Sequence, residues 1–188
     1  SLSSKFKNVN CLKAKGVGKK NAISQAIGVA KNDFILTSDA DCRIPKDWVL
    51  KMLSPFADNE VQLSVGGVVY QKGNNSFENW QALEFMSLIG SGAGAIGAGF
   101  PFMCNGANLA FRKEIFSDFN QNIASGDDVF LMHLIKKNGG KIVFVKEDSS
   151  LITTSAKSSL SSFMSQRKRW ASKSNFFPSS SNQFVECF

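Results

Sequence analysis

The sequence predicts an α/β domain with a mixed, mostly parallel sheet flanked by helices. In the first half of the chain, segments with apolar residues at helical spacing alternate with short β-branched runs, which is typical of parallel sheets covered by helices. The chain has 188 residues, enough for one ordinary domain with a buried core. Two acidic residues, Asp39 and Asp41, directly follow a predicted buried strand. Ligands of such sheets bind beyond the carboxyl ends of the strands, so a site is expected there.

The first half of the chain holds the clearest alternation of elements. In chain order we expect a short strand at 6–12, a helix at 22–30, a strand at 34–37, a helix from Pro45 to Leu53 and a strand at 61–70. The helices are indicated by apolar residues three and four positions apart and by a proline suited to a first helical turn. The strand at 61–70 is β-branched but interrupted by Gly66 and Gly67, which predicts a bulge.

The second half continues with further elements of both kinds. In chain order we expect a helix at 77–89, a strand at 108–111, a helix that starts within 125–128 and ends at Lys137, strands at 141–145 and 151–154, and a last helix from Leu160 to Trp170. The helix that ends at Lys137 opens on serine and acidic residues, which suit a helix start, and stops at Asn138-Gly139-Gly140. Residues 1–174 are therefore expected to form one domain, and the serine-rich residues 175–188 a loose tail.

One uncharged stretch, residues 85–111, exceeds the length that a bilayer requires. It contains Gly90, Gly92, Gly94, Gly97 and Gly99, followed by Pro101. So many glycines make a poor free-standing helix. The stretch therefore predicts close packing or an interfacial segment rather than a membrane span.

Charge and cysteine usage limit the partners and the compartment. The net charge of +7 suggests an anionic partner: a phosphate-bearing substrate, an acidic membrane surface or nucleic acid. The alternative is that the charge only forms a solvated basic surface. Four scattered cysteines fit a reducing compartment. With no CxxC pair and a single histidine, His133, a Cys/His zinc site is nearly excluded.

The Asp39-Ala40-Asp41 segment is the first candidate for chemistry. Two carboxylates one residue apart at a strand end can together bind a hard divalent cation, and that cation can bind a diphosphate at the same time. The alternative is a solvated Asx turn. Upstream, residues 16–22 open a helix with glycines and lysines; they fail the Walker pattern, yet a basic helix start such as Lys19 suits a nearby phosphate.

Two further segments complete the set. The acid pair Asp127-Asp128 stands at a predicted helix start, where one carboxylate can act as a base and the other can orient it; helix capping is the alternative. In the last helix, Gln166, Arg169 and Trp170 stand at i, i+3 and i+4 and so share one face. Arginine suits phosphate, and tryptophan suits stacking on a sugar ring. A basic amphipathic helix at a membrane surface is the alternative there.

Together these segments resemble the family 2 glycosyltransferases with a GT-A fold, the group that contains cellulose, chitin and hyaluronan synthases and many bacterial polysaccharide enzymes. The resemblance runs from about Gly16 to Lys173 and rests on residues 18–22, 34–42, 105–112, 125–128 and 166–170. Residues 166–170, Gln-Arg-Lys-Arg-Trp, match the family's QxxRW motif, which is highly specific when it follows a DxD motif and an acidic pair in that order.

The resemblance implies a role for each matching residue in an inverting transfer from a nucleotide-sugar donor. Asp39 would touch the nucleotide and share with Asp41 the binding of Mg²⁺ or Mn²⁺. Asp128 takes the place of the general base, the last acid of a TED motif that here reads Gly126-Asp127-Asp128. The remaining implied contacts are Lys19, Gln166 and Arg169 on the donor diphosphate, and Trp170, Asp127, Asn105 and Gly106 at the acceptor.

The sequence also departs from the family pattern. The first strand, with an acidic residue that binds the nucleotide base, and its βαβ unit are not visible, and no membrane helices follow QxxRW. We therefore expect a catalytic core cut from a larger protein at the cytoplasmic face of the cell membrane. The expected partners are a nucleotide-sugar donor, by resemblance a UDP-sugar, and a saccharide or lipid-linked acceptor, with the membrane reached through segments outside this chain.

Two rival classes predict different behaviour. A non-catalytic basic module would bind nucleic acid or anionic lipid through residues 167–170, and its affinity for nucleic acid would fall steeply with salt, whereas nucleotide-sugar binding would depend on metal. A nucleotidyltransferase also uses acidic metal sites, but its glycine-rich, basic amino-terminal motif is not seen and QxxRW is foreign to it. The sequence therefore favours the glycosyltransferase, with no nucleic-acid partner expected.

Overall fold

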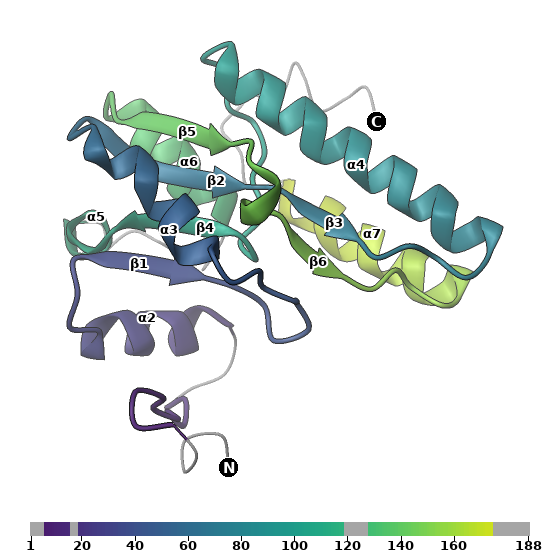
Figure 1. Ribbon diagram of the computed structural model, residues 1–188, viewed down its shortest axis with the longest axis horizontal. Coiled ribbons are helices and arrows are strands. Elements are labelled where there is room, and N and C mark those ends of the chain that lie inside the picture. Colours follow the sequence, from purple (N-terminus) through teal and green to yellow (C-terminus); the bar gives the residue numbers. More distant parts are fainter. Residues whose placement is uncertain (1–5, 16–18, 119–127, 175–188) are drawn as a thin grey trace.

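A four-stranded mixed sheet forms the centre of the molecule (Figure 1). The computed structural model describes residues 6–15, 19–118 and 128–174. The strands lie in the order β1 (Phe34–Thr37), β4 (Leu109–Arg112), β2 (Val61–Gly66) and β5 (Lys141–Val145). β4 runs antiparallel to β1 and to β2, while β2 and β5 are parallel. Three of the four strands therefore share one direction, and their carboxyl ends meet at one edge of the sheet.

A smaller sheet continues from that edge. It consists of β3 (Val68–Tyr70) and β6 (Ile152–Thr154), which are parallel. The predicted single strand at 61–70 is thus two strands in two sheets, and the irregular pairing lies between Val61 and Leu63 rather than at the glycines. A Cβ on Gly66 would lie 2.3 Å from Asn108 Nδ2, so the glycine is required by the close approach of that side chain.

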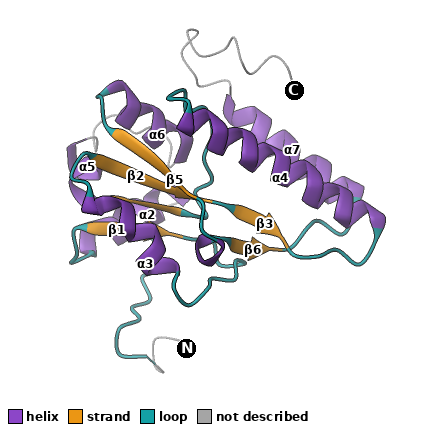
Figure 2. Cartoon of the chain, turned by 45° about the horizontal axis from the view of Figure 1, so that its top comes forward, coloured by secondary structure: helices purple, strands orange, loops and turns teal. Residues whose placement is uncertain are grey.

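Helices cover both faces of the main sheet (Figure 2). The helices that cover the main sheet are α2 (Lys19–Val29), α3 (Trp48–Leu53), α4 (Ser76–Gly97), α5 (Lys113–Asp118) and α6 (Asp128–Lys137), with 3₁₀ turns at Ser54–Ala57 and Asp148–Ser150. The last helix, α7 (Leu160–Ser174), packs against α4 instead. One apolar cluster joins α2 and α6 to the sheet around Leu63 and Met132. A second cluster joins α3, α4 and β6 around Met52 and Ile152. The predicted α/β class is confirmed.

Two local predictions in the amino-terminal half need correction. Residues 6–12 form no strand: they are exposed coil with a turn closed by the hydrogen bond from Val9 N–H to the Phe6 carbonyl. The helix expected from Pro45 begins only at Trp48, whose N–H donates to the Pro45 carbonyl over 3.3 Å. By contrast α6 ends as predicted, since Gly139 has a positive φ of 78° and Gly140 N–H donates to Ile135 O, the pattern of a Schellman cap.

Helix α4 is longer than the sequence predicted. It was expected to end near Ile89 but runs to Gly97, and Phe85, Gly92 and Ile96 are buried along it. A Cβ on Gly92 would lie 3.2 Å from the Met103 carbonyl oxygen, so one glycine lets the returning chain pack closely, as expected for this stretch. Burial of this face outweighs the low helix propensity of glycine. Within the described ranges, no helix has the length and apolar character to cross a membrane.

Asn108 is a buried polar hub behind the carboxyl edge of the sheet. Its Nδ2 donates to the carbonyls of Gly67 at 2.8 Å and Ser150 at 2.9 Å, and its Oδ1 accepts from Trp48 Nε1 at 2.8 Å. The residue is fully buried. These bonds join β4, the β2–β3 junction, α3 and the turn before β6, so the side chain fixes how the two sheets meet.

Replacing Asn108 with alanine is expected to lower the free energy of unfolding by about 3 kcal/mol or more, because each buried group left without a partner costs about 1–3 kcal/mol. Urea denaturation followed by tryptophan fluorescence measures the change. The matched control is Asn32→Ala, at an exposed loop position, which should change the free energy of unfolding by less than about 0.5 kcal/mol. Equal stability of the two variants would contradict the role of Asn108.

Candidate active site

The turn after β1 places the two predicted metal-binding carboxylates. Asp39 is half-buried and Asp41 exposed, and the carbonyl of Asp39 accepts from Cys42 N–H at 3.1 Å to close the turn. The next residue, Arg43, exchanges backbone hydrogen bonds of 2.8 and 3.1 Å with Thr153 of β6. The turn is therefore anchored between the two sheets, with both carboxylates at the carboxyl edge.

A second carboxylate site is linked to this turn through Gly106. Thr37, the last residue of β1, donates its hydroxyl to the Gly106 carbonyl at 2.7 Å. The Gly106 N–H in turn donates to Asp128 Oδ2, while Asp128 Oδ1 accepts from Val129 N–H at 3.2 Å. The structure thus joins the end of β1 to the first residue of α6. Gly106 contacts Asp128, and it lines the same groove as Asp39.

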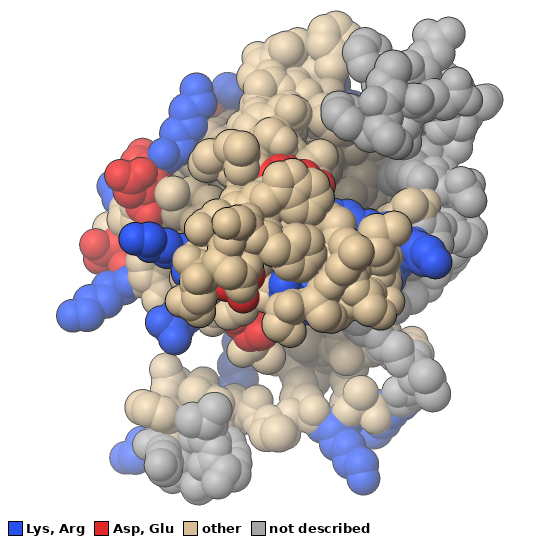
Figure 3. Space-filling model, turned by 90° about the vertical axis from the view of Figure 1, so that its right-hand side faces the viewer, with Lys and Arg blue, Asp and Glu red and all other residues tan. Residues whose placement is uncertain are grey.

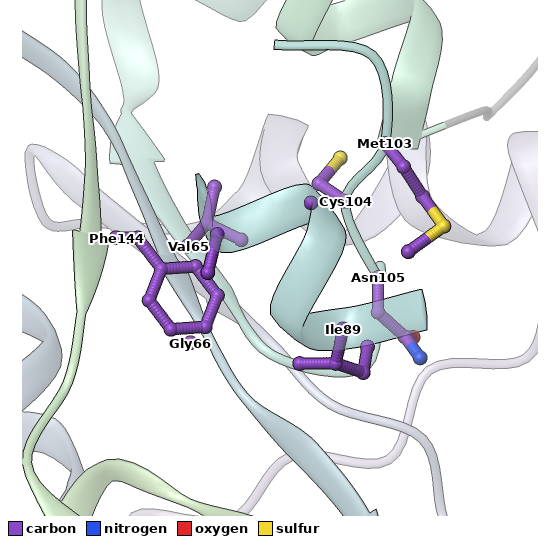
Figure 4. Close-up of a pocket in the computed structure, with 9 residues that line it drawn as sticks. Val65, Gly66, Ile89, Met103, Cys104, Asn105 and Phe144 are labelled. Atoms are coloured by element: carbon purple, nitrogen blue, oxygen red, sulfur yellow. The ribbon is translucent and has the colours of Figure 1, made fainter. Parts of the chain in front are cut away.

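Asn105 shapes the turn that presents Gly106. The side chain is half-buried, its Oδ1 accepts from Ala107 N–H at 3.0 Å, and its carbonyl accepts from Asn108 N–H at 2.9 Å. Asn105 also lines a cavity of about 10 Å³ beside α4, shown in Figure 4. That volume holds about one water molecule, so the cavity is no substrate site.

The local electrostatics of the Asp39–Asp41 turn favour a cation. Burial raises the pKa of the Cys42 thiol, and the neighbouring carboxylates of Asp41 and Asp39 raise it further. The thiol therefore stays neutral, and the negative charge of the turn belongs to the two carboxylates. Two carboxylate ligands, completed by water and substrate phosphate, suit Mg²⁺. In the part of the chain that the structure describes, no three acidic, histidine or cysteine side chains gather around one point.

A groove of about 370 Å³ opens beside Asp39, between α2 and the outer edge of β1. Its walls are largely apolar, and Ser38, Asp39 and Gly106 supply polar groups at one end. Lys19 is the first residue of α2, but its side chain lies outside the described residues, as does Asp127. The groove therefore brings an apolar wall and a carboxylate to one place, an arrangement suited to a small ligand.

Helix α7 carries the remaining predicted residues. Gln166 and Trp170 are half-buried on the side that faces α4 and β3, and Arg169 is exposed. Gln166 Oε1 accepts from the Tyr70 hydroxyl at 3.4 Å, and the Trp170 ring lies 5.8 Å from that of Phe85. Stacking on a sugar ring needs an exposed face of the tryptophan, whereas Trp170 is half-buried and also packs against the core.

The surface around α4 and α7 bears on the predicted membrane alternative. Figure 3 views the end of the molecule at which these helices begin; mostly uncharged residues fill its middle, with a few acidic groups among them, and Lys and Arg side chains stand mostly toward its rim. The aromatic face of α7 packs inward, with Phe163 lying 5.4 Å from Trp80 between ring centroids. The aromatic part of the apolar face of α7 is therefore covered by α4, whereas Leu160 and Met164 on the same helix are exposed.

Three residues that bear on the site were missed from the sequence: Thr37, Arg43 and Tyr70. Thr37 offered one signal, because a hydroxyl ends an otherwise apolar strand. Arg43 acts through its backbone, and Tyr70 lies in another sheet, so neither left a local pattern.

Comparison with known proteins identifies the family. The family model described as glycosyl transferase family group 2 matches residues 34–183. The chain belongs to this family, and it is therefore a glycosyltransferase domain. This agrees with the GT-A fold that the sequence resemblance implied.

Other comparisons add little to this assignment. No curated protein sequence matches the chain. A similar solved structure is glucosyl-3-phosphoglycerate synthase from Mycobacterium tuberculosis, with 14% identity and a TM-score of 0.48 over 86% of this chain and 54% of that chain. The chain thus spans about half the length of that enzyme.

Replacing Gly106 with alanine is expected to lower glycosyl transfer at least about tenfold, because the new Cβ would lie 2.7 Å from Asp128 Oδ2 and would displace that carboxylate. Initial rates with a UDP-sugar measure the effect. The matched control is Gly94→Ala on α4, where a Cβ meets no atom within 4 Å. That control should keep full activity and gain up to about 1 kcal/mol of stability. Full activity in the Gly106 variant would show that Asp128 needs no fixed position.

Proposed function

We propose that this domain transfers a sugar from a nucleoside diphosphate donor, a UDP-sugar, to an acceptor hydroxyl with inversion at the anomeric carbon. The observation that carries the proposal is the Thr37–Gly106–Asp128 chain of hydrogen bonds, which joins Asp128 to the strand that leads into Asp39. One carboxylate site suits a metal and diphosphate, and the other suits a base. Sugar transfer would then take place at this edge of the sheet, with the donor at the first site and the acceptor at the second.

Asp128 is the proposed general base. It takes the proton of the acceptor hydroxyl while that oxygen bonds to the anomeric carbon and the bond from that carbon to the diphosphate oxygen breaks. The products are the glycoside, the nucleoside diphosphate and a protonated Asp128. Because the attack comes from the face opposite the leaving group, configuration inverts. The Gly106 N–H holds Asp128 Oδ2, so the carboxylate is already oriented before the acceptor binds.

Asp39 and Asp41 are the proposed residues that hold Mg²⁺ or Mn²⁺. When bound there, the ion supplies positive charge that stabilises the departing diphosphate. Among the protein groups, Arg169 and Gln166 are proposed to bind the diphosphate oxygens, with Lys19 contributing from the start of α2. The exposure of Arg169 on α7 is compatible with this contact.

The acceptor side is proposed to include Trp170, Asn105, Gly106 and Asp127. We propose a saccharide or lipid-linked acceptor, and a role in cell-surface polysaccharide synthesis at the cytoplasmic face of a membrane. The apolar groove beside Asp39 supports the donor part of the proposal, because a nucleoside needs an apolar wall next to its diphosphate site.

A transfer assay tests the proposal directly. The chain is incubated with Mn²⁺, a panel of UDP-sugars and short oligosaccharide acceptors, and the new glycosidic bond is examined by proton NMR. Release of UDP together with a product whose anomeric configuration is opposite to that of the donor supports the proposal. A product that retains the configuration of the donor would exclude the single displacement by Asp128.

A further inference from the structure

A charged pair ties the last helix to α4. Arg167 Nη2 donates to Glu84 Oε2, and the two side chains are only 19% and 29% exposed. No charged residue follows Glu84 until Arg112, so this carboxylate stands in an otherwise uncharged stretch. A pair so largely removed from water is costly to break on one side, because the other charge is left without compensation.

The same arginine lies over two aromatic rings of its own helix. Its guanidinium carbon is 4.7 Å from the ring centroid of Phe163 and 4.3 Å from that of Trp170. The flat guanidinium group can stack on an aromatic face in addition to attracting it by its charge, whereas a lysine ammonium cannot stack. Arg167 is thus held between Glu84 of α4 and the rings of α7, and it limits how far Trp170 can turn.

A second set of contacts holds the neighbouring residue, Gln166. The Tyr70 hydroxyl donates to Gln166 Oε1, and the Tyr70 ring stacks on Phe85 with a centroid distance of 4.5 Å. Burial raises the pKa of Tyr70, so its hydroxyl keeps its proton at neutral pH and remains a donor. Phe85 in turn touches Trp170. Figure 2 shows α4 and α7 side by side. Tyr70, Phe85 and Trp170 belong to one apolar cluster.

We propose that Glu84 and Arg167 are positioning residues that fix α7 so that Gln166 and Arg169 meet the donor diphosphate, an inference that rests on the proposed function. Neither residue touches the donor. Their contribution is to keep α7 at one distance and rotation relative to α4, because displacements of about 1 Å can cost 10²-fold in reactions that depend on orientation. The effect should therefore appear in donor affinity as well as in stability.

Calorimetric titration with UDP and Mn²⁺ tests the inference. Glu84→Gln and Arg167→Met are each expected to weaken UDP binding on the order of tenfold. The double variant should bind UDP no more weakly than the weaker-binding single variant, because the two substitutions remove the same interaction. Arg167→Lys, which keeps the charge but not the flat fork, should lie between wild type and Arg167→Met. The control is Asp58→Asn, which removes an exposed pair with Lys141 and should leave UDP affinity unchanged.

Urea denaturation of the same variants separates the outcomes. Reduced stability with unchanged UDP affinity in Glu84→Gln would overturn the positioning role, leaving a purely structural contact. This near-isosteric change keeps an acceptor oxygen, so it decides the question if Arg167→Met does not fold. A folded wild-type chain that binds no UDP with Mn²⁺ would instead overturn the proposed donor site, and the inference with it.

Discussion

Replacing Asp128 with asparagine is expected to lower kcat by about 10²–10⁴-fold while the affinity for UDP with Mn²⁺ stays the same. An asparagine has the size of the aspartate and its carbonyl oxygen can still accept from Gly106 N–H, so the turn should keep its shape. What the variant loses is the ability to take the acceptor proton. The loss corresponds to about 3–5 kcal/mol of transition-state stabilisation.

Steady-state kinetics with a UDP-sugar and acceptor measure the change, and calorimetry with UDP checks donor binding. The matched control is Asp33→Asn, an exposed aspartate just before β1, which should retain wild-type kcat and KM. If Asp128→Asn turned over at the wild-type rate, Asp128 would not be the base. If it instead lost UDP binding with normal folding, Asp128 would belong to the donor site.

Replacing Asp41 with alanine is expected to abolish the part of UDP binding that depends on Mn²⁺. The wild-type chain should bind UDP at least about tenfold more tightly with Mn²⁺ than without it, whereas the variant should bind equally weakly in both conditions. The physical reason is that a divalent ion joins the carboxylates of the turn to the diphosphate, and loss of the exposed ligand removes that link.

The matched control for this experiment is Asp47→Ala. Asp47 precedes α3, is exposed and makes no side-chain capping hydrogen bond, so its removal changes the net charge equally without touching the turn. If metal-dependent UDP binding survived in Asp41→Ala but was lost in a second variant, Asp39→Ala, the metal ligand would be Asp39 rather than Asp41. Survival in both would place it elsewhere.

The sequence by itself determined the features that depend on neighbours along the chain. The strand Phe34–Thr37 and the acidic turn behind it follow from an apolar run that ends in polar residues, and the end of α6 follows from Asn138-Gly139-Gly140. The α/β class and the family also follow, because motif order and spacing are properties of the chain itself. The predicted roles of the site residues remain predictions.

Only the tertiary structure decided which of these segments meet, and in which direction. β4 is antiparallel to both of its neighbours, the strand at 61–70 divides between two sheets, and α4 continues through its glycines because its inward face is buried. The Thr37–Gly106 and Glu84–Arg167 contacts span 69 and 83 positions. Local periodicity reports the face and type of each element, whereas contacts between distant segments arise from packing the whole chain.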